Sequence, residues 1–311
     1  MPTPHERTEE SRRTAGVLAI SLTTILWGLV PLVLKQTTMS ALSFAAYRLW
    51  CGVLVFAVVF AVTGRRLPMA TVRTCALGGV FFAVDVACSF LAFQLTSVAN
   101  ATIIGALAPV FIALGAARWF GERVARRDLL FVIASFAGVA MVAIGSVGSP
   151  TAGVWGDVFA GISVLFWTAY SLYSKRSRAN IGALEYMASV MTVAAVLMTV
   201  FALVFGEGLT PPHGADWGWI WLVTLLPGAL GHSLVAWSHR HVEAWLGSLI
   251  TQCQPIVASL AAWVLLGESL TIATIAGGVV VLACTGAVLL DTRRGEPDDT
   301  FAEPESPAPA G

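Results

Sequence analysis

Charged residues are scarce in this sequence: Asp, Glu, Lys and Arg make up 12% of its 311 residues, and their formal charges sum to zero. A soluble domain carries about 25% charged residues. The deficit therefore excludes an ordinary water-soluble protein. No nucleic-acid partner is expected.

Motifs for bound groups are also missing. The five cysteines form no C-x-x-C pair, so neither a disulfide framework nor a metal site is expected. No G-x-x-x-x-G-K-[ST] motif occurs, so the chain is not expected to hydrolyse ATP. A nucleophile elbow begins at Gly231 but lacks its closing glycine. We therefore expect no cofactor, no metal and no enzymatic activity.

Apolar residues, in contrast, make up 57% of the chain, with a mean hydropathy of +0.80. They fall in blocks of about 18 residues or more, the length that crosses a hydrocarbon layer about 30 Å thick. The first block could be a signal sequence, but it lacks a small-x-small cleavage site and more spans follow it. The sequence predicts an all-α integral membrane protein with ten transmembrane helices. The expected spans are residues 17–35, 43–63, 74–94, 97–119, 129–147, 156–175, 184–205, 217–238, 243–266 and 272–290.

Two stretches of the chain resemble each other. One runs past Pro109 into Gly121-Glu122, and the other past Pro255 into Gly267-Glu268, with an offset of 146 residues in each case. Self-similarity at a fixed spacing indicates a duplicated unit, which many secondary transporters use to build an alternating-access site.

The positive charges predict how the two halves are oriented. With the N-terminus in the cytoplasm, sixteen of the 18 Lys and Arg residues fall on the cytoplasmic side, Lys35 falls outside and Arg48 lies within a span. Five spans in each half is an odd number, so the second half enters the membrane inverted. The prediction is two inverted five-helix repeats with a cavity where they meet.

The chain resembles the drug/metabolite transporter superfamily, specifically its EamA-like type. The residues that carry the resemblance are Trp27-Gly28, the stretch 96–111 with Gly121-Glu122-Arg123, and Gln254-Pro255 with Gly267-Glu268. It implies spans 1–4 and 6–9 around a central cavity, with spans 5 and 10 more peripheral. The second half departs from the pattern by having Ser269 where the first has Arg123. The expected domains are residues 17–147 and 155–290, flanked by disordered cytoplasmic tails at 1–16 and 291–311.

Asp85 is the strongest single candidate for function. It stands near the middle of the third span, where a carboxylate costs about 2.5–3.5 kcal/mol on insertion scales. Such a group rarely faces lipid, and it could take up and release a proton during transport. The alternative is a structural hydrogen bond to a neighbouring helix.

The other candidates are polar or aromatic groups within spans. Arg48, with Tyr47 as a neighbour, could attract an anionic substrate or pair with Asp85, or else snorkel to the headgroups. Trp27 and Trp167 occupy equivalent positions in the two halves, and Tyr170 shares a face with the latter; they could line a cavity or simply pack helices.

His232 aligns within one residue of Asp85 after the 146-residue offset, so the two could share proton coupling. A histidine with a backbone partner is the alternative. Asn100 and Gln252 are candidate substrate contacts or interhelical hydrogen-bonding groups. Pro109 and Pro255 are expected to kink their helices.

These features together predict a proton-coupled secondary transporter of small organic metabolites or amphiphilic compounds, with alternating access around a midplane cavity. Export is implied by the family resemblance alone. An uncoupled facilitator and a non-transporting membrane sensor or scaffold are the alternatives. Expected partners are the substrate, protons and the lipid bilayer, and a homodimer is left open. The expected location is the inner (plasma) membrane, with both termini cytoplasmic.

Overall fold

The computed structural model describes residues 4–34, 36–96, 98–121, 126–145, 154–205, 208–266 and 270–294. These residues form α-helices and one π-helix, with no strand among them. The helices of the first half are α1 (Pro4–Gly28), α2 (Val30–Leu34), α3 (Ala41–Thr63), α4 (Met69–Leu95), α5 (Val98–Gly105), α6 (Ala108–Phe120) and α7 (Arg126–Gly145). Those of the second half are α8 (Val154–Arg178), α9 (Ala183–Val204), α10 (Asp216–Val223), the π-helix η1 (Thr224–Gly231), α11 (His232–Ser238), α12 (Ala244–Thr251), α13 (Gln254–Leu266) and α14 (Ile272–Arg294).

Seven helical stretches of the described chain are long and apolar enough to cross a membrane. They are Ala41–Thr63, Met69–Ala92, Ile103–Phe120, Ala183–Val204, Asp216–Ser238, Ala244–Leu265 and Ile272–Leu290. The protein is therefore a multi-pass membrane protein, as the sequence predicts. The helices α1, α7 and α8 fall outside this group; charged residues occupy the first part of α1 and of α7 and both ends of α8. The count of ten crossings stays a prediction.

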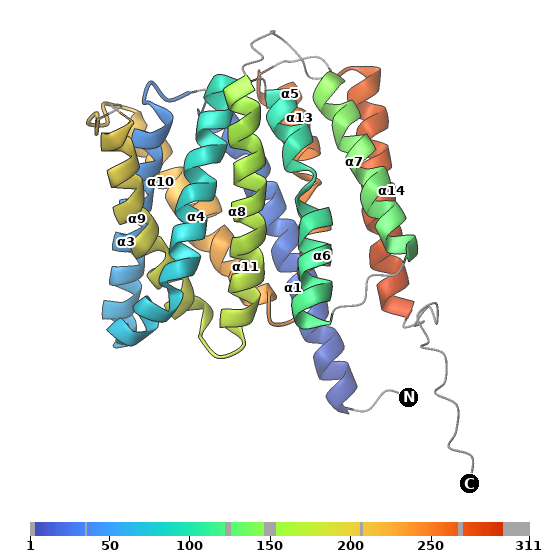
Figure 1. Cartoon of the computed structure of the whole chain (residues 1–311), viewed down its shortest axis with the longest axis horizontal. Helices are drawn as coiled ribbons and strands as arrows, with labels where there is room; N and C mark the ends of the chain where they lie inside the picture. The colour runs from blue at the N-terminus through green and yellow to red at the C-terminus, as the bar shows by residue number, and fades with distance from the viewer. Residues whose placement is uncertain are drawn as a thin grey trace.

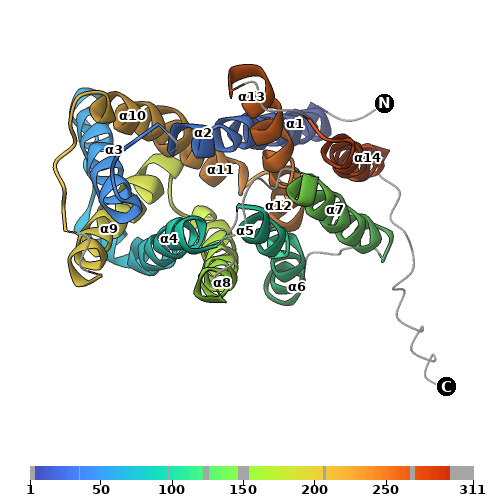
Figure 2. The same ribbon diagram turned by 90° about the horizontal axis from the view of Figure 1, so that it is seen from above.

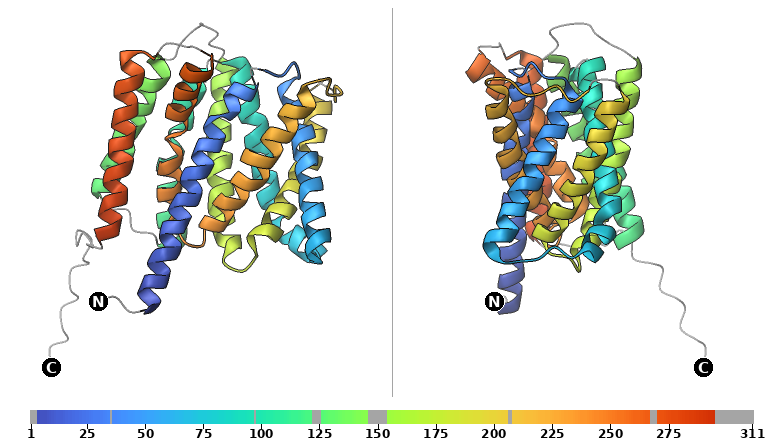
Figure 3. Two further views of the ribbon diagram at one scale, coloured as in Figure 1. Left: turned by 180° about the vertical axis from the view of Figure 1, so that it is seen from behind. Right: turned by 90° about the vertical axis from the view of Figure 1, so that its left-hand side faces the viewer.

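The helices stand side by side and run alternately up and down (Figure 1). α1 begins and α14 ends at the same end of the bundle, called here the lower end after its place in Figure 1; the opposite end is the upper end. Viewed from above, α4 and α8 lie on one side of the bundle and α1 on the other (Figure 2). The two side views show α1 running along the face opposite α8 (Figure 3).

Several pairs of helices join the first half of the chain to the second. α1 packs on α11, α4 on α8, α3 on α9, and α7 on α14. The last pair stands at one edge of the bundle (Figure 2). There the two backbones approach closely, since a Cβ added at Gly138 would lie 2.8 Å from the carbonyl oxygen of Gly277. Only residues without a side chain allow such an approach, which is common between membrane helices.

Each of the two duplicated stretches contains a broken helix. α5 ends and α6 begins across residues 106–107, and α12 ends and α13 begins across residues 252–253. The N–H of Leu107 donates to the carbonyl oxygen of Ile104 at 3.1 Å. The N–H of Cys253, 146 residues further on, donates to Ile250 at the same distance. The two breaks therefore share their local hydrogen bonding.

Candidate functional site

Aromatic rings from both halves of the chain meet inside the bundle. Trp27 on α1 lies edge-on to Trp167 on α8, with ring centroids 5.5 Å apart, and 4.7 Å from the ring of His232 on α11. Phe82 on α4 completes the group, 4.7 Å from His232 and 5.2 Å from Tyr170. We call these five residues the ring cluster. Its packing is dense, because Phe82 and Tyr170 are fully buried.

Asp85 lies one helical turn beyond Phe82 on α4, so it borders the ring cluster. Its side chain is buried, and its Oδ1 accepts a hydrogen bond of 2.7 Å from the hydroxyl of Ser163 on α8. An interhelical bond of this kind is what the structural alternative for Asp85 requires. The same bond would also orient the carboxyl group if the residue exchanges protons, so both interpretations agree with the geometry.

Arg48 brings the opposite charge to the same region. The residue is 8% exposed, its guanidinium carbon lies 5.8 Å from the centroid of the Phe90 ring, and its charge interacts with that of Asp85. Its Nε is buried without a hydrogen-bond partner among the described residues. Snorkelling along the surface does not describe this side chain, because it is enclosed by the bundle.

His232 has aromatic neighbours but little hydrogen bonding. Its Nδ1 is buried and lacks a partner among the described residues, and its ring contacts Trp27 and Phe82. A buried nitrogen without a partner is costly. The alternative interpretation of His232, a histidine hydrogen-bonded to the backbone, is not met at Nδ1 among the described residues.

The span that carries His232 is widened into the π-helix η1 just before it. The sequence predicts a loosened helix here from Pro227, Gly228 and Gly231, since proline has no N–H to donate. The indole Nε1 of Trp27 donates to the carbonyl oxygen of Pro227 at 2.9 Å. π-Helical turns are rare and are frequent at functional sites. Trp27 therefore both lines the ring cluster and ties α1 to η1.

Two predicted site residues lie apart from the ring cluster. Tyr47 pairs with Trp217, with centroids 6.0 Å apart, near the upper end. The side-chain amide of Gln252 donates to the carbonyl oxygen of Ala106 at 2.8 Å and accepts a hydrogen bond from Ser135 on α7. Both the nitrogen and the oxygen of the Gln252 side-chain amide are thus hydrogen-bonded to other protein groups. The side chain of Asn100 lies outside the described residues.

The two repeat prolines stand immediately after the helix breaks. Pro109 is the second residue of α6, and Pro255 is the second residue of α13. Proline is well tolerated in the first turn of a helix, where its missing N–H has no intrahelical acceptor. Each segment is therefore two short helices separated by a break, whereas the sequence analysis expected one kinked helix.

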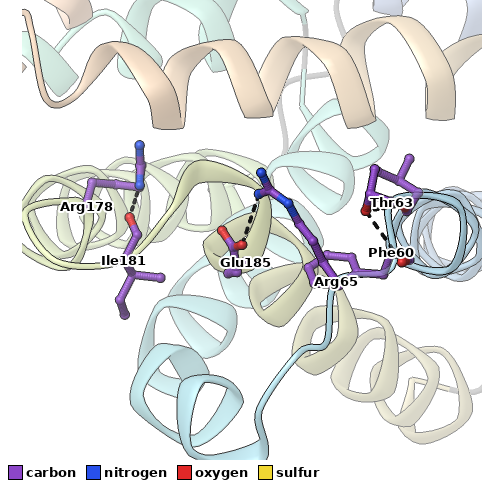
Figure 4. Close-up of polar contacts among 7 residues, drawn as sticks. Phe60, Thr63, Arg65, Arg178, Ile181 and Glu185 are labelled. Atoms are coloured by element: carbon purple, nitrogen blue, oxygen red, sulfur yellow. Dashed lines mark hydrogen bonds and ion pairs between the residues drawn. The ribbon is translucent and has the colours of Figure 1, made fainter.

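Polar contacts join the helices at both ends of the bundle. At the upper end, the hydroxyl of Thr37 donates to Oδ1 of Asp216 at 2.8 Å. At the lower end, Arg65 pairs with Glu185 at 3.3 Å (Figure 4). Arg178, which is 2% exposed, donates from Nε to the carbonyl oxygen of Ala236 at 2.7 Å. Its Nη1 donates to the carbonyl oxygen of Ile181 (Figure 4).

Ser163 and Phe82 both belong to this site and are not among the residues that the sequence analysis singled out. Ser163 stands four residues before Trp167, so the two share a helix face, and this spacing could have identified it. Phe82 stands three residues before Asp85 and could have been found in the same way.

The sequence model of the EamA-like transporter family matches residues 14–144 and, a second time, residues 154–290. The chain belongs to the EamA-like transporter family. Curated relatives of this family member include an uncharacterized transporter of Archaeoglobus fulgidus, 25% identical over 86% of this chain and 94% of the relative. The pseudopaline exporter CntI of Pseudomonas aeruginosa is 22% identical over 87% of this chain and 94% of its own length. One solved crystal structure superposes with a TM-score of 0.76 at 21% identity, covering 91% of this chain and 99% of the other.

The EamA family is a family of transporters, so transport is the activity that the family membership indicates for this chain. Among the described residues, no group of three or more His, Cys, Asp or Glu side chains could hold a metal ion. The ring cluster with Asp85 and Arg48 is the candidate transport site, because most of its side chains are buried, it carries charge and it joins the two halves that match the family.

Proposed function

We propose that this EamA protein is a proton-coupled secondary transporter of small organic metabolites or amphiphilic compounds. The observation that carries the proposal is the buried Asp85, held by Ser163 and bordering the ring cluster. A carboxylate inside a membrane bundle is expensive to keep, and such groups mark substrate and proton pathways. Asp85 would bind and release the coupling proton, and His232 would assist it.

The ring cluster suggests how the substrate would be held. Trp27 and Phe82 come from the first half of the chain, and Trp167, Tyr170 and His232 from the second. Aromatic faces suit the apolar or cationic parts of a solute. Arg48 would attract an anionic part. A substrate between the two halves would then contact both at once.

Alternating access would come from two inverted five-helix repeats, residues 17–147 and 155–290, crossing the membrane ten times. Three observations support this arrangement: the family matches both halves, the two helix breaks share their hydrogen bonds, and α1–α11 contacts have a counterpart in α8–α4 contacts. Inverted repeats place the substrate site at their interface and expose it to one side of the membrane at a time.

The location and direction of transport follow from charge and relatives. The bias of Lys and Arg toward one side favours a cytoplasmic lower end of the bundle. Both terminal segments, 1–16 and 291–311, would then lie in the cytoplasm. The membrane would be the inner (plasma) membrane. We propose that the direction of transport is export, because one relative is named as a pseudopaline exporter. The substrate pseudopaline is that of the relative.

The test is substrate flux by purified protein in sealed proteoliposomes with an imposed pH gradient. Metabolites that raise the thermal stability of the detergent-purified protein would be used as radiolabelled substrates. Asp85→Asn should abolish accumulation driven by the pH gradient while the protein inserts normally. Asp157→Asn is the matched control, because this carboxylate bonds Thr96 at the upper end and lies outside the ring cluster.

The alternatives give different results in the same vesicles. An uncoupled facilitator would equilibrate the substrate at a rate independent of the pH gradient, in wild type and Asp85→Asn alike. A sensor or scaffold would give no flux for any stabilising metabolite. Full gradient-driven accumulation by Asp85→Asn would contradict the proton-coupling role.

A further inference from the structure

A cavity lies at the lower end of the bundle, apart from the ring cluster. Its volume is about 860 Å³, and it borders the last turns of α8. The end of α6 and the lower part of α4 form its walls (Figure 1). None of the five residues of the ring cluster lines it. The transport site therefore does not account for this cavity.

The polar side of the cavity is positively charged. Lys175 and Arg176 contribute from the last turn of α8, and Arg240 from the segment after α11. No acidic residue among the described residues lines the cavity. Arg176 and Arg240 bring two positive charges to this space beside Lys175, and clustered charges of one sign attract an anion.

Contacts with the backbone hold two of these cations in place. The amine of Lys175 donates to the carbonyl oxygen of Val242 at 3.1 Å and lies 5.9 Å from the centroid of the Phe120 ring. Nη2 of Arg240 donates to the carbonyl oxygen of Ala179 at 3.3 Å. Side chains fixed in this way lose less conformational freedom when an anion binds.

The other side of the cavity is apolar and open. Leu77 on α4 is 48% exposed, and Trp119 on α6 is 65% exposed. Both helices are among the stretches that can cross a membrane, so we expect these exposed side chains to face the lipid. Phe81 and Tyr173 add aromatic surface between them. Tryptophan and tyrosine favour the depth at which acyl chains meet headgroups.

We propose that this cavity binds the phosphate headgroup of an anionic phospholipid, with its acyl chains lying against α4 and α6. A cationic recess next to an apolar, lipid-facing wall matches an amphiphile that has a negative head and two apolar tails. Basic pockets between transmembrane helices are known to hold anionic headgroups. A soluble anion would use the cations but would gain nothing from the apolar wall.

The test compares bound lipid in wild type and variants. The protein is reconstituted in nanodiscs of mixed phosphatidylcholine and phosphatidylglycerol. It is then released from the nanodiscs, and native mass spectrometry identifies the lipids that it retains. Wild type should retain phosphatidylglycerol in preference to phosphatidylcholine. Arg176→Gln/Arg240→Gln should lose roughly 30-fold in the affinity for phosphatidylglycerol, since each cation near the surface is worth about fivefold. Both arginines are exposed, so the variant should fold.

Arg66→Gln/Arg73→Gln is the matched control, because these exposed arginines lie outside the cavity lining. It should retain phosphatidylglycerol like wild type. An equal loss in both double variants would overturn the proposal in favour of general surface attraction. Unchanged retention of phosphatidylglycerol in Arg176→Gln/Arg240→Gln would also overturn the proposal. If lipid-free protein binds inorganic phosphate tightly and shows no preference for phosphatidylglycerol, the proposal is overturned and the ligand of the cavity is a soluble anion. Flux in the proteoliposome assay tests the transport proposal separately.

Discussion

His239 links the end of α11 to α8 through one buried ring. It follows the last residue of α11, is 8% exposed, and has Nδ1 2.8 Å from the hydroxyl of Ser174 on α8. Burial, and then the nearby charges of Lys175 and Arg178, lower the pKa of His239 to about 3. An unfolded chain would give the same ring a pKa of about 6.5. The folded protein therefore holds His239 neutral in acid where the unfolded chain protonates it.

The sign of the resulting pH effect follows from that difference. Between the two pKa values the unfolded state binds more protons, so the free energy of unfolding falls as the pH decreases from about 6.5. His239→Gln should flatten the decline in thermal stability between about pH 6.5 and pH 4, measured on detergent-purified protein. His213→Gln, at an exposed position, is the control and should leave the slope unchanged. A decline in His239→Gln as steep as in wild type would contradict this origin.

Individual residues of the site differ in how far the sequence can predict them. A carboxylate in an apolar span is conspicuous, so Asp85 needs no structure to be noticed. Its partner Ser163 is an ordinary serine in another span, and which serine faces Asp85 depends on how α4 and α8 are rotated against each other. Gln252 illustrates the same point, since its amide bonds α7 and the α5–α6 break.

Among the elements, the pair α7–α14 depends most on the absence of side chains. Gly138 and Gly277 bring the two backbones together at one edge of the bundle. A methyl group at residue 277 would meet backbone atoms of residue 138, which cannot rotate away as a side chain can. The helices would have to separate along their contact.

Gly277→Ala is therefore expected to lower the free energy of unfolding by about 1–3 kcal/mol, the usual cost of overpacking. The better helix propensity of alanine, worth up to about 1 kcal/mol, is smaller and does not offset this cost. Gly286→Ala on the same helix is the control, because a Cβ there meets no atom within 4 Å. It should be neutral or slightly stabilising in thermal unfolding of the detergent-solubilised protein. Equal stability of the two variants would show that the close approach is unimportant.

Apolar length and prolines predict where the helices run, but not their internal irregularities. The run 217–238 predicts a single helix, and the structure divides it into α10, η1 and α11. Pro227 signals a disturbance, yet the π-helical form also depends on the indole of Trp27 reaching its carbonyl oxygen from 200 residues away. No local pattern contains that contact.

At the scale of the whole molecule, the placement of the ends is open to direct test. A green fluorescent protein fused after residue 311 should fluoresce, because it folds on the cytoplasmic side. Alkaline phosphatase fused to chains truncated at residue 210 should be active, because that upper-end position is expected outside. The positive charges at the lower end give the physical reason. Phosphatase activity from a fusion at residue 311 would contradict the inverted repeat.

The duplication is the molecular feature that the sequence predicts best, because it repeats Pro109 and Gly121 at a constant offset as Pro255 and Gly267. Which segments of the two halves touch cannot be obtained from that offset. The association of α1 with α11, and of α7 with α14, joins segments from opposite halves, so it depends on side-chain packing that no local pattern contains.

The bond from Gln252 to Ala106 links two residues separated by 146 positions, so it fastens corresponding points of the duplicated units to each other. Neither broken helix can shift along its axis without stretching this bond or drawing the other helix with it. We therefore expect a small molecule bound at this contact to restrict the movement of both units, even if the transported solute binds elsewhere.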